Sequence, residues 1–169
     1  MTLAKEGFLD PKELEILPGM PSKERLAEGP VVIIECAQEI PCNPCEEACH
    51  KQAIEIGESI TNLPRLDASK CGGCGLCIAA CPGQAIFVVD MTYSETEATV
   101  QLPYEFLPLP QKGDIVDGLN RAGEMVCDAK VLKVINPKSF DRTAVITVAV
   151  PKKFGMEVRC IALKKSDKG

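Results

Sequence analysis

Hydrophobic and polar residues are distributed differently along three parts of the chain. Residues 1–30 are polar and rich in Pro and Gly, and they predict one short helix over residues 21–28 that ends at Gly29. The next segment, Val31–Ile34, consists of four β-branched residues and predicts a strand. Two further apolar stretches of strand length lie at residues 54–56 and 86–89. The first half of the chain therefore predicts short elements separated by loops.

From about residue 98 onward the pattern becomes that of a β-sheet. Apolar stretches recur between turn signals, and in residues 143–150 alternate positions form one apolar face. The predicted strands are residues 98–102, 114–118, 125–135, 143–150 and 156–163. Five short strands at this spacing predict a small antiparallel β-barrel.

The cysteine-rich region, residues 36–90, contains an internal repeat with an offset of 32 residues. Residues 45–54, CEEACHKQAI, match residues 77–86, CIAACPGQAI, in the pattern C-x-x-A-C-x-x-Q-A-I. An apolar stretch of strand length lies at the end of each copy. Because repeats often define a fold, we interpret each half as a cysteine loop, a short helix and a strand.

Composition and charge narrow the classes of protein to consider. The chain has ten cysteines, only 4% aromatic residues and no Trp, so the cysteines are expected to help hold it together. Its N-terminus lacks the apolar core of a signal peptide, and no apolar run approaches the roughly 18 residues that span a bilayer. We therefore expect a reducing, cytoplasmic compartment, where clustered cysteines indicate metal binding. A net charge of −5 argues against nucleic acid as the main partner.

The most specific motif is CGGCGLCIAACP at residues 71–82, which has the spacing C-x2-C-x2-C-x3-C-P. This spacing is typical of bacterial ferredoxins, in which the fourth cysteine binds the other cluster. Glycines between the cysteines let the backbone turn tightly and present N–H groups to sulfur. Structural zinc is the alternative, but zinc sites usually use two C-x2-C pairs.

On these residues the chain resembles the two-[4Fe-4S] ferredoxin family over about residues 31–90. The resemblance implies an α+β fold with two halves related by a pseudo-twofold axis. It also implies a crossed ligand pattern. One cluster would be bound by Cys71, Cys74, Cys77 and Cys49, and the other by Cys42, Cys45, Cys81 and one further ligand.

The further ligand is not given by the repeat, because the position equivalent to Cys71 is occupied by Glu39. Cys36 lies three residues earlier and follows the strand if that strand extends over Val31–Glu35, much as Cys71 follows the stretch Leu66–Ser69. We expect Cys36 to be the ligand, with Ala37-Gln38-Glu39 forming a bulge in the loop. The alternatives are Glu39 as a carboxylate ligand, a three-iron cluster that lacks this ligand, and Cys36 as an inert buried thiol.

The remaining residues of chemical interest are expected to have ordinary roles. His50, the only histidine, stands where the second motif has Pro82, and it is expected to face solvent rather than to tune a cluster. Cys127 and Cys160 alternate with apolar neighbours in predicted strands and are expected to be buried thiols. A disulfide between them and an interchain ligand role are the alternatives.

No motif of an enzyme active site is present. The chain lacks a nucleotide-binding G-x-G-x-x-G, a P-loop and a nucleophile–base pair, and a fully ligated cluster has no open position for substrate. The sequence therefore predicts a non-catalytic electron relay. We divide it into an N-terminal docking arm (residues 1–30), a two-cluster ferredoxin domain (31–93) and a small barrel (97–165).

The added arm and barrel make the chain similar to the ferredoxin-like subunits of multi-subunit FAD-dependent amine or imino-acid dehydrogenases of the hydroxyproline or sarcosine type. This resemblance implies a larger flavoprotein as partner. The alternatives are a stand-alone electron carrier whose barrel binds another partner, and a structural module stabilised by metal.

Overall fold

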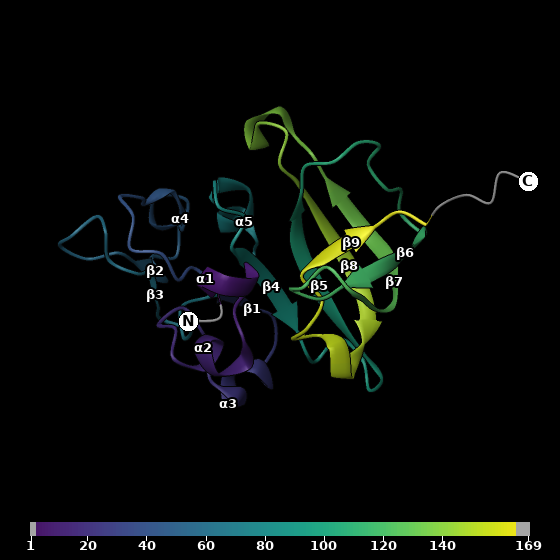
Figure 1. Ribbon diagram of the computed structural model, residues 1–169, viewed down its shortest axis with the longest axis horizontal. Coiled ribbons are helices and arrows are strands. Elements are labelled where there is room, and N and C mark those ends of the chain that lie inside the picture. The colour runs from purple at the N-terminus through teal and green to yellow at the C-terminus, as the bar shows by residue number, and fades with distance from the viewer. Residues whose placement is uncertain (1–2, 165–169) are drawn as a thin grey trace, which may run out of the picture.

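Strands dominate the structure, a computed structural model in which residues 3–164 are described. One seven-stranded antiparallel sheet forms the larger part, and the cysteine region with its short helices lies at one side of it (Figure 1). The strand order is β1 (Val31–Ile34), β4 (Ile86–Asp90), β5 (Glu97–Tyr104), β8 (Ala144–Pro151), β7 (Met125–Ile135), β6 (Ile115–Leu119) and β9 (Cys160–Ala162). The described residues contain no helix long and apolar enough to cross a membrane.

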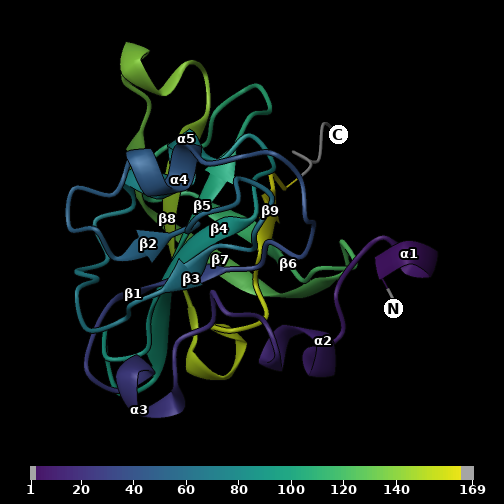
Figure 2. The same ribbon diagram turned by 90° about the vertical axis from the view of Figure 1, so that its left-hand side faces the viewer.

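The cysteine region consists of short elements. Its helices are α4 (Pro44–Glu47) and α5 (Leu76–Ala80), and its two-stranded sheet pairs β2 (Ile54–Glu55) with β3 (Arg65–Leu66). Figure 2 shows α4 and α5 side by side in front of the large sheet. Each copy of the repeat therefore forms a cysteine loop, a short helix and a strand, as predicted.

The N-terminal arm contains three short helices, α1 (Leu3–Glu6), α2 (Pro11–Glu15) and α3 (Lys23–Leu26). Asp10 begins α2 with a capping box, in which its carboxylate accepts from the backbone N–H of Glu13 and the Glu13 carboxylate accepts from the N–H of Asp10. Ser22 caps α3 in the same position. The predicted helix over residues 21–28 is thus shorter at both ends, and α1 and α2 were not predicted. Residues 1–2 of the arm lie outside the described residues.

All five strands predicted from residue 98 onward are present; β7 has the predicted ends, and the ends of the other four differ by one to four residues. The last strand is the shortest. A turn that follows η2 (Lys152–Phe154) extends into the start of the predicted segment, and the strand begins only at Cys160. A further 3-10 helix, η1 (Lys138–Phe140), connects β7 to β8. Residue 165, the end of the predicted barrel, lies outside the described residues.

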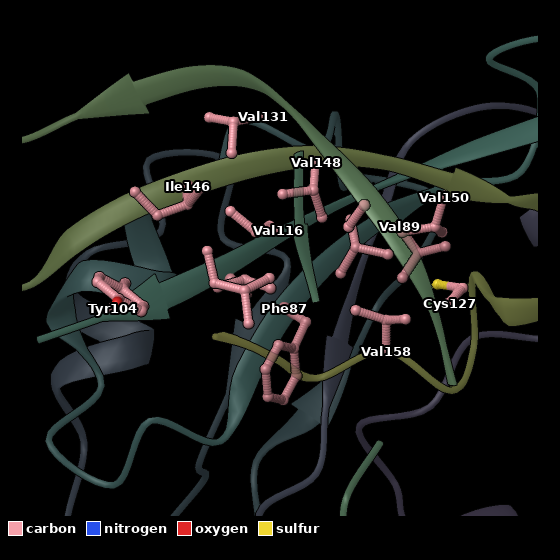
Figure 3. Close-up of a cluster of buried hydrophobic side chains, with 14 of the residues drawn as sticks. Phe87, Val89, Tyr104, Val116, Cys127, Val131, Ile146, Val148, Val150 and Val158 are labelled. Carbon is pink, nitrogen blue, oxygen red and sulfur yellow. The ribbon is translucent and has the colours of Figure 1, made fainter. Parts of the chain in front are cut away.

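The predicted closed barrel is not confirmed. Strand pairing runs from β1 at one edge to β9 at the other, and no pairing between described strands joins these edges. The sheet instead curls around an apolar core that contains Phe87, Val148 and Val158 (Figure 3). The sheet also crosses the predicted domain boundary, since β4 pairs with β5 through Val89 and Val100.

Strands β1 and β4 form a wall with apolar cores on both faces. One face of the wall, which includes Ile33 and Phe87, belongs to the core of the large sheet. The other face, which includes Val32, Ile34 and Val88, packs with the buried cysteines. Burial on both faces explains why these strands are apolar throughout rather than alternating.

Because the wall is shared, the two regions are expected to unfold together. Ile33→Ala removes a fully buried side chain on the sheet face and should lower the free energy of unfolding by about 2–5 kcal/mol. Ile16→Ala, at a side chain that is 80% exposed, should change it by no more than about 0.5 kcal/mol. Chemical denaturation is followed by circular dichroism, which reports on the sheet, and by the visible absorbance of the expected clusters, which reports on the cysteine region. The two signals should give coincident transitions for both variants. Separate transitions would contradict a shared wall.

Candidate iron–sulfur site

Eight of the ten cysteines line two cavities, four to each. The first cavity, of about 260 Å³, is lined by Cys36, Cys42, Cys45 and Cys81. The second, of about 310 Å³, is lined by Cys49, Cys71, Cys74 and Cys77. Each cavity therefore takes three cysteines from one stretch of the chain and one from the other. This grouping has the same crossed pattern as the ligand sets expected from the resemblance.

The turn after each helix directs a backbone N–H at a cysteine sulfur. Gln52 and Gln84, equivalent in the repeat, both adopt a left-handed backbone with φ of 51°. The following residues donate to sulfur, Ala53 N to Cys49 Sγ at 3.3 Å and Ala85 N to Cys81 Sγ at 3.5 Å. The two halves thus repeat the same local structure around the cysteine that crosses to the other cavity.

Backbone hydrogen bonds extend this symmetry beyond the matched sequence. Glu35 N donates to Ala85 O, and Asp67 N, 32 residues later, donates to Ala53 O, both at 2.8 Å. Adjacent residues of the arm bind both halves, since Gly19 O accepts from Ile34 N and Pro18 O accepts from Leu66 N, both at 3.1 Å. The arm is therefore part of the framework that positions the cysteine loops.

The loop at residues 71–77 depends on glycine. Gly73 and Gly75 have φ of 68° and 81°, where a side chain is strained. A Cβ at Gly73 would also lie 2.7 Å from the Cβ of Pro30. The tight turn brings two N–H groups, those of Gly73 and Val32, to 3.4 Å from Cys71 Sγ. Such N–H groups stabilise thiolate sulfur.

The irregular loop places Cys36 with the other three cysteines of its set. Ala37, Gln38 and Ile40 also line the first cavity, whereas Glu39 is exposed and is not among the residues around it. Leu3 and Leu9 of the arm also line this cavity. This contribution of the arm was not predicted, because nothing in its sequence indicates the surface that it covers.

Burial makes the most enclosed of these thiols, Cys45 and Cys77, weaker acids than a free cysteine in the chain alone. It raises the pKa of Cys45 from 9.0 to about 11, and the nearby Cys81, Cys42 and Cys36 contribute. It likewise raises the pKa of Cys77 from 9.0 to about 12, with contributions from Cys74, Cys71 and Cys49. Since thiolates are the metal-binding form, metal binding must displace these protons.

The thiols surround their cavities and do not converge on one point. Within residues 3–164, no three or more His, Cys, Asp or Glu side chains are arranged to hold a metal ion. Of the eight cysteines, Cys74 is exposed, so the second cavity reaches the surface there.

The other residues considered from the sequence lie elsewhere or at the margin. His50 is exposed beside the second cavity, as expected. Cys127 is buried in the sheet core opposite Gly118, whereas Cys160 is only partly buried, opposite Leu119. Both are free thiols, and neither lines a cysteine cavity.

The cysteine region is similar to known proteins. Residues 40–85 match the family described as a 4Fe-4S dicluster domain. The chain is 35% identical over 51 residues to the ferredoxin-type protein NapF of Escherichia coli K12, covering 29% of this chain and 31% of NapF. It is 35% identical over 68 residues to the uncharacterized ferredoxin MJ0155 of Methanocaldococcus jannaschii, covering 40% of each chain.

A further relative is one of the subunits of an ion-translocating oxidoreductase complex from Methanosarcina acetivorans. It is 43% identical over 47 residues, which cover 28% of this chain and 17% of that relative. The chain thus covers between about a sixth and two fifths of the length of these relatives. No solved structure matches the chain.

These matches support a ferredoxin-like cysteine region and confirm the expectation of two [4Fe-4S] clusters. The matched segment contains seven of the eight cysteines that line the cavities. The eighth, Cys36, lies four residues before the match begins.

The raised thiol pKa values predict that the metal-free chain loses stability in alkaline solution. The thiols of the unfolded chain ionise near pH 9, whereas Cys45 and Cys77 in the folded chain stay protonated up to about pH 11 and 12. The unfolded state therefore releases protons first, and the stability that these thiols contribute below pH 9 is lost as pH rises toward 11–12.

The measurement is the urea midpoint of the metal-free chain at about pH 7, 9 and 10.5, a range that spans the ordinary thiol pKa. The midpoint should fall over this range, and less steeply for Cys77→Ala than for the unaltered chain. The iron-loaded chain, whose thiols are already deprotonated, should show a weaker fall. Equal slopes for all three proteins would contradict the assignment.

Proposed function

We propose that this chain is a non-catalytic electron-transfer subunit, which relays single electrons through its two [4Fe-4S] clusters within a larger, flavin-dependent oxidoreductase complex. The observation that carries the proposal is the pair of cavities, each lined by four cysteines, behind one shared strand wall. Two such sites close together in one chain suit the passage of electrons from one partner to another.

The proposed ligands are Cys36, Cys42, Cys45 and Cys81 for the first cluster, and Cys49, Cys71, Cys74 and Cys77 for the second. The surroundings fit this group, since each cavity combines four thiols with backbone N–H donors to sulfur and apolar walls. When bound, the clusters supply one-electron chemistry. The thiolates hold the iron, the N–H groups offset their charge, and the apolar residues limit the access of water.

Two features support a subunit rather than a free carrier. The large sheet and the arm go beyond what the dicluster segment needs, and the β5–β6 loop exposes Phe106 and Leu107, which are 66% and 86% accessible. Exposed large apolar side chains of this kind are common at docking surfaces. One relative is itself named as a subunit of an oxidoreductase complex. The flavoprotein partner and the cytoplasmic location are proposed from the sequence.

A stand-alone carrier is the second candidate. It is favoured by the relatives named as ferredoxins and by the net charge of −5, which suits transient docking on basic partners. Co-purification of the full chain from its native host distinguishes the two candidates. We expect a stable complex with a larger, flavin-containing chain that persists in high salt. Recovery of the chain alone at every salt concentration would overturn the subunit proposal and leave the stand-alone carrier.

The ligand proposal predicts about eight iron and eight sulfide per chain after anaerobic purification. Cys36→Ser should reduce or convert only one of the two cluster signals in electron paramagnetic resonance, because a hydroxyl is a poorer ligand than a thiolate. Cys127→Ser, at a thiol outside both cavities, is the matched control and should keep both signals. Two unchanged signals in Cys36→Ser would refute Cys36 as a ligand, and a loss in Glu39→Gln would indicate the carboxylate instead.

A further inference from the structure

A group of three charged side chains joins the first cavity to the large sheet. Glu35 lines that cavity and directly precedes Cys36. One of its carboxylate oxygens, Oε2, accepts from Arg121 Nε at 2.9 Å, and the other, Oε1, accepts from Arg121 Nη2 and from Arg159 Nε, the latter at 2.7 Å. We call Glu35, Arg121 and Arg159 the ion triad. Its two arginines come from distant parts of the chain, the β6–β7 turn and the residue before β9.

The side chains of the ion triad are largely buried, and both arginines make further contacts. The side chains of Glu35, Arg121 and Arg159 are only 8%, 16% and 4% accessible. Arg121 Nη2 also donates to Met156 O at 3.0 Å, and Arg159 Nη1 donates to Val158 O at 2.7 Å. The Arg159 guanidinium lies over the Phe87 ring, 5.0 Å from its centroid. These contacts fix both arginines against the sheet.

The charges of the ion triad do not cancel. One carboxylate faces two guanidinium groups, and among the described residues Arg159 Nη2 is buried without a hydrogen-bond partner. A net positive charge with little access to water acts over a longer range than the same charge at the surface, because it is weakly screened.

Among the described residues, the second cavity is lined by the exposed Lys51 but by no comparable group of ion-paired side chains. Arg25 of α3 donates to four backbone carbonyls, those of Ala68, Gly29, Pro30 and Cys71. Arg25 is a partly exposed single cation, and these hydrogen bonds bind it to backbone carbonyls rather than to a second charged side chain. Arg25 holds the Cys71 loop through hydrogen bonds to its backbone. The ion triad holds the Cys36 loop and also places a buried charge beside it.

We propose that Glu35, Arg121 and Arg159 are positioning residues that fix the Cys36 loop on the large sheet and whose excess positive charge favours electron uptake at the first cavity. Adding an electron adds negative charge there, which a nearby buried cation stabilises. The proposal rests on the proposed function, since it requires a cluster in each cavity. In this arrangement the large sheet sets the difference in redox potential between the two sites.

The test is a redox titration of the full, iron-loaded chain, followed by electron paramagnetic resonance. Cys36→Ser and Cys71→Ser assign the two signals to the two cavities. Arg121→Gln removes a positive charge and should move the midpoint potential of the first-cavity signal to a more negative value. Glu35→Gln removes a negative charge and should move it in the opposite direction. Neither should move the second-cavity signal.

Opposite shifts separate a charge effect from a loss of structure, since structural damage would disturb the signal in the same way in both variants. If Glu35→Gln does not fold, Arg121→Lys replaces it. The lysine keeps the charge, so the first-cavity potential should stay closer to that of the unaltered chain than in Arg121→Gln. Arg25→Gln is the matched control at the other cavity and should leave the first-cavity potential unchanged.

An unaltered chain without two four-iron signals would refute the proposed function itself. With both signals present, an Arg121→Gln chain whose first-cavity potential is unchanged, or whose two potentials shift equally, would overturn the role of the ion triad.

Discussion

The pairing of β1 with β4 is the constraint on which both sites depend. This strand pair is apolar on both faces. Its apolar surface is therefore removed from water only when the sheet core and the cysteine core both pack against it. The end of β1 leads directly to Cys36, and an N–H on its outer edge, that of Val32, reaches Cys71 Sγ. One edge strand thus contributes to both cavities, and its unpaired N–H groups, a liability in an open sheet, are used by sulfur and by the arm.

Electrostatics then decides what such a core can hold. Burial raises the pKa of the Cys45 and Cys77 thiols, so the cavities favour neutral groups until iron replaces the protons. Burial also raises the pKa of the Glu35 carboxyl, but hydrogen bonds and the charges of Arg121 and Arg159 outweigh it, so the pKa lies below its ordinary value. Burial lowers the pKa of Arg159 to about 10, which leaves it charged at neutral pH. The core therefore accepts charge only where a fixed partner compensates for lost hydration.

The features that could be predicted from the sequence are those with a local signature. The repeat shows in matched residues such as Gln52 and Gln84, and the later strands show in their apolar alternation. Closure of the sheet has no such signature, because it depends on whether two distant edges meet. The roles of Arg25 and Glu35 were also hidden, since a surface-like arginine and a glutamate after a strand look ordinary until the fold brings their partners close.

The irregular spacing before Cys42 is accompanied by the absence of glycine from that loop. Between Cys71 and Cys74, Gly73 adopts a left-handed backbone, and two residues are enough to turn the chain. The loop from Cys36 to Cys42 contains no glycine, and none of its residues has a positive φ, so it lacks the left-handed turn that Gly73 makes and follows a longer path. A longer loop positions its first cysteine less firmly. Contacts from outside the loop, the apolar side chains of the arm and the ion triad at Glu35, supply the constraint that glycine supplies in the other half.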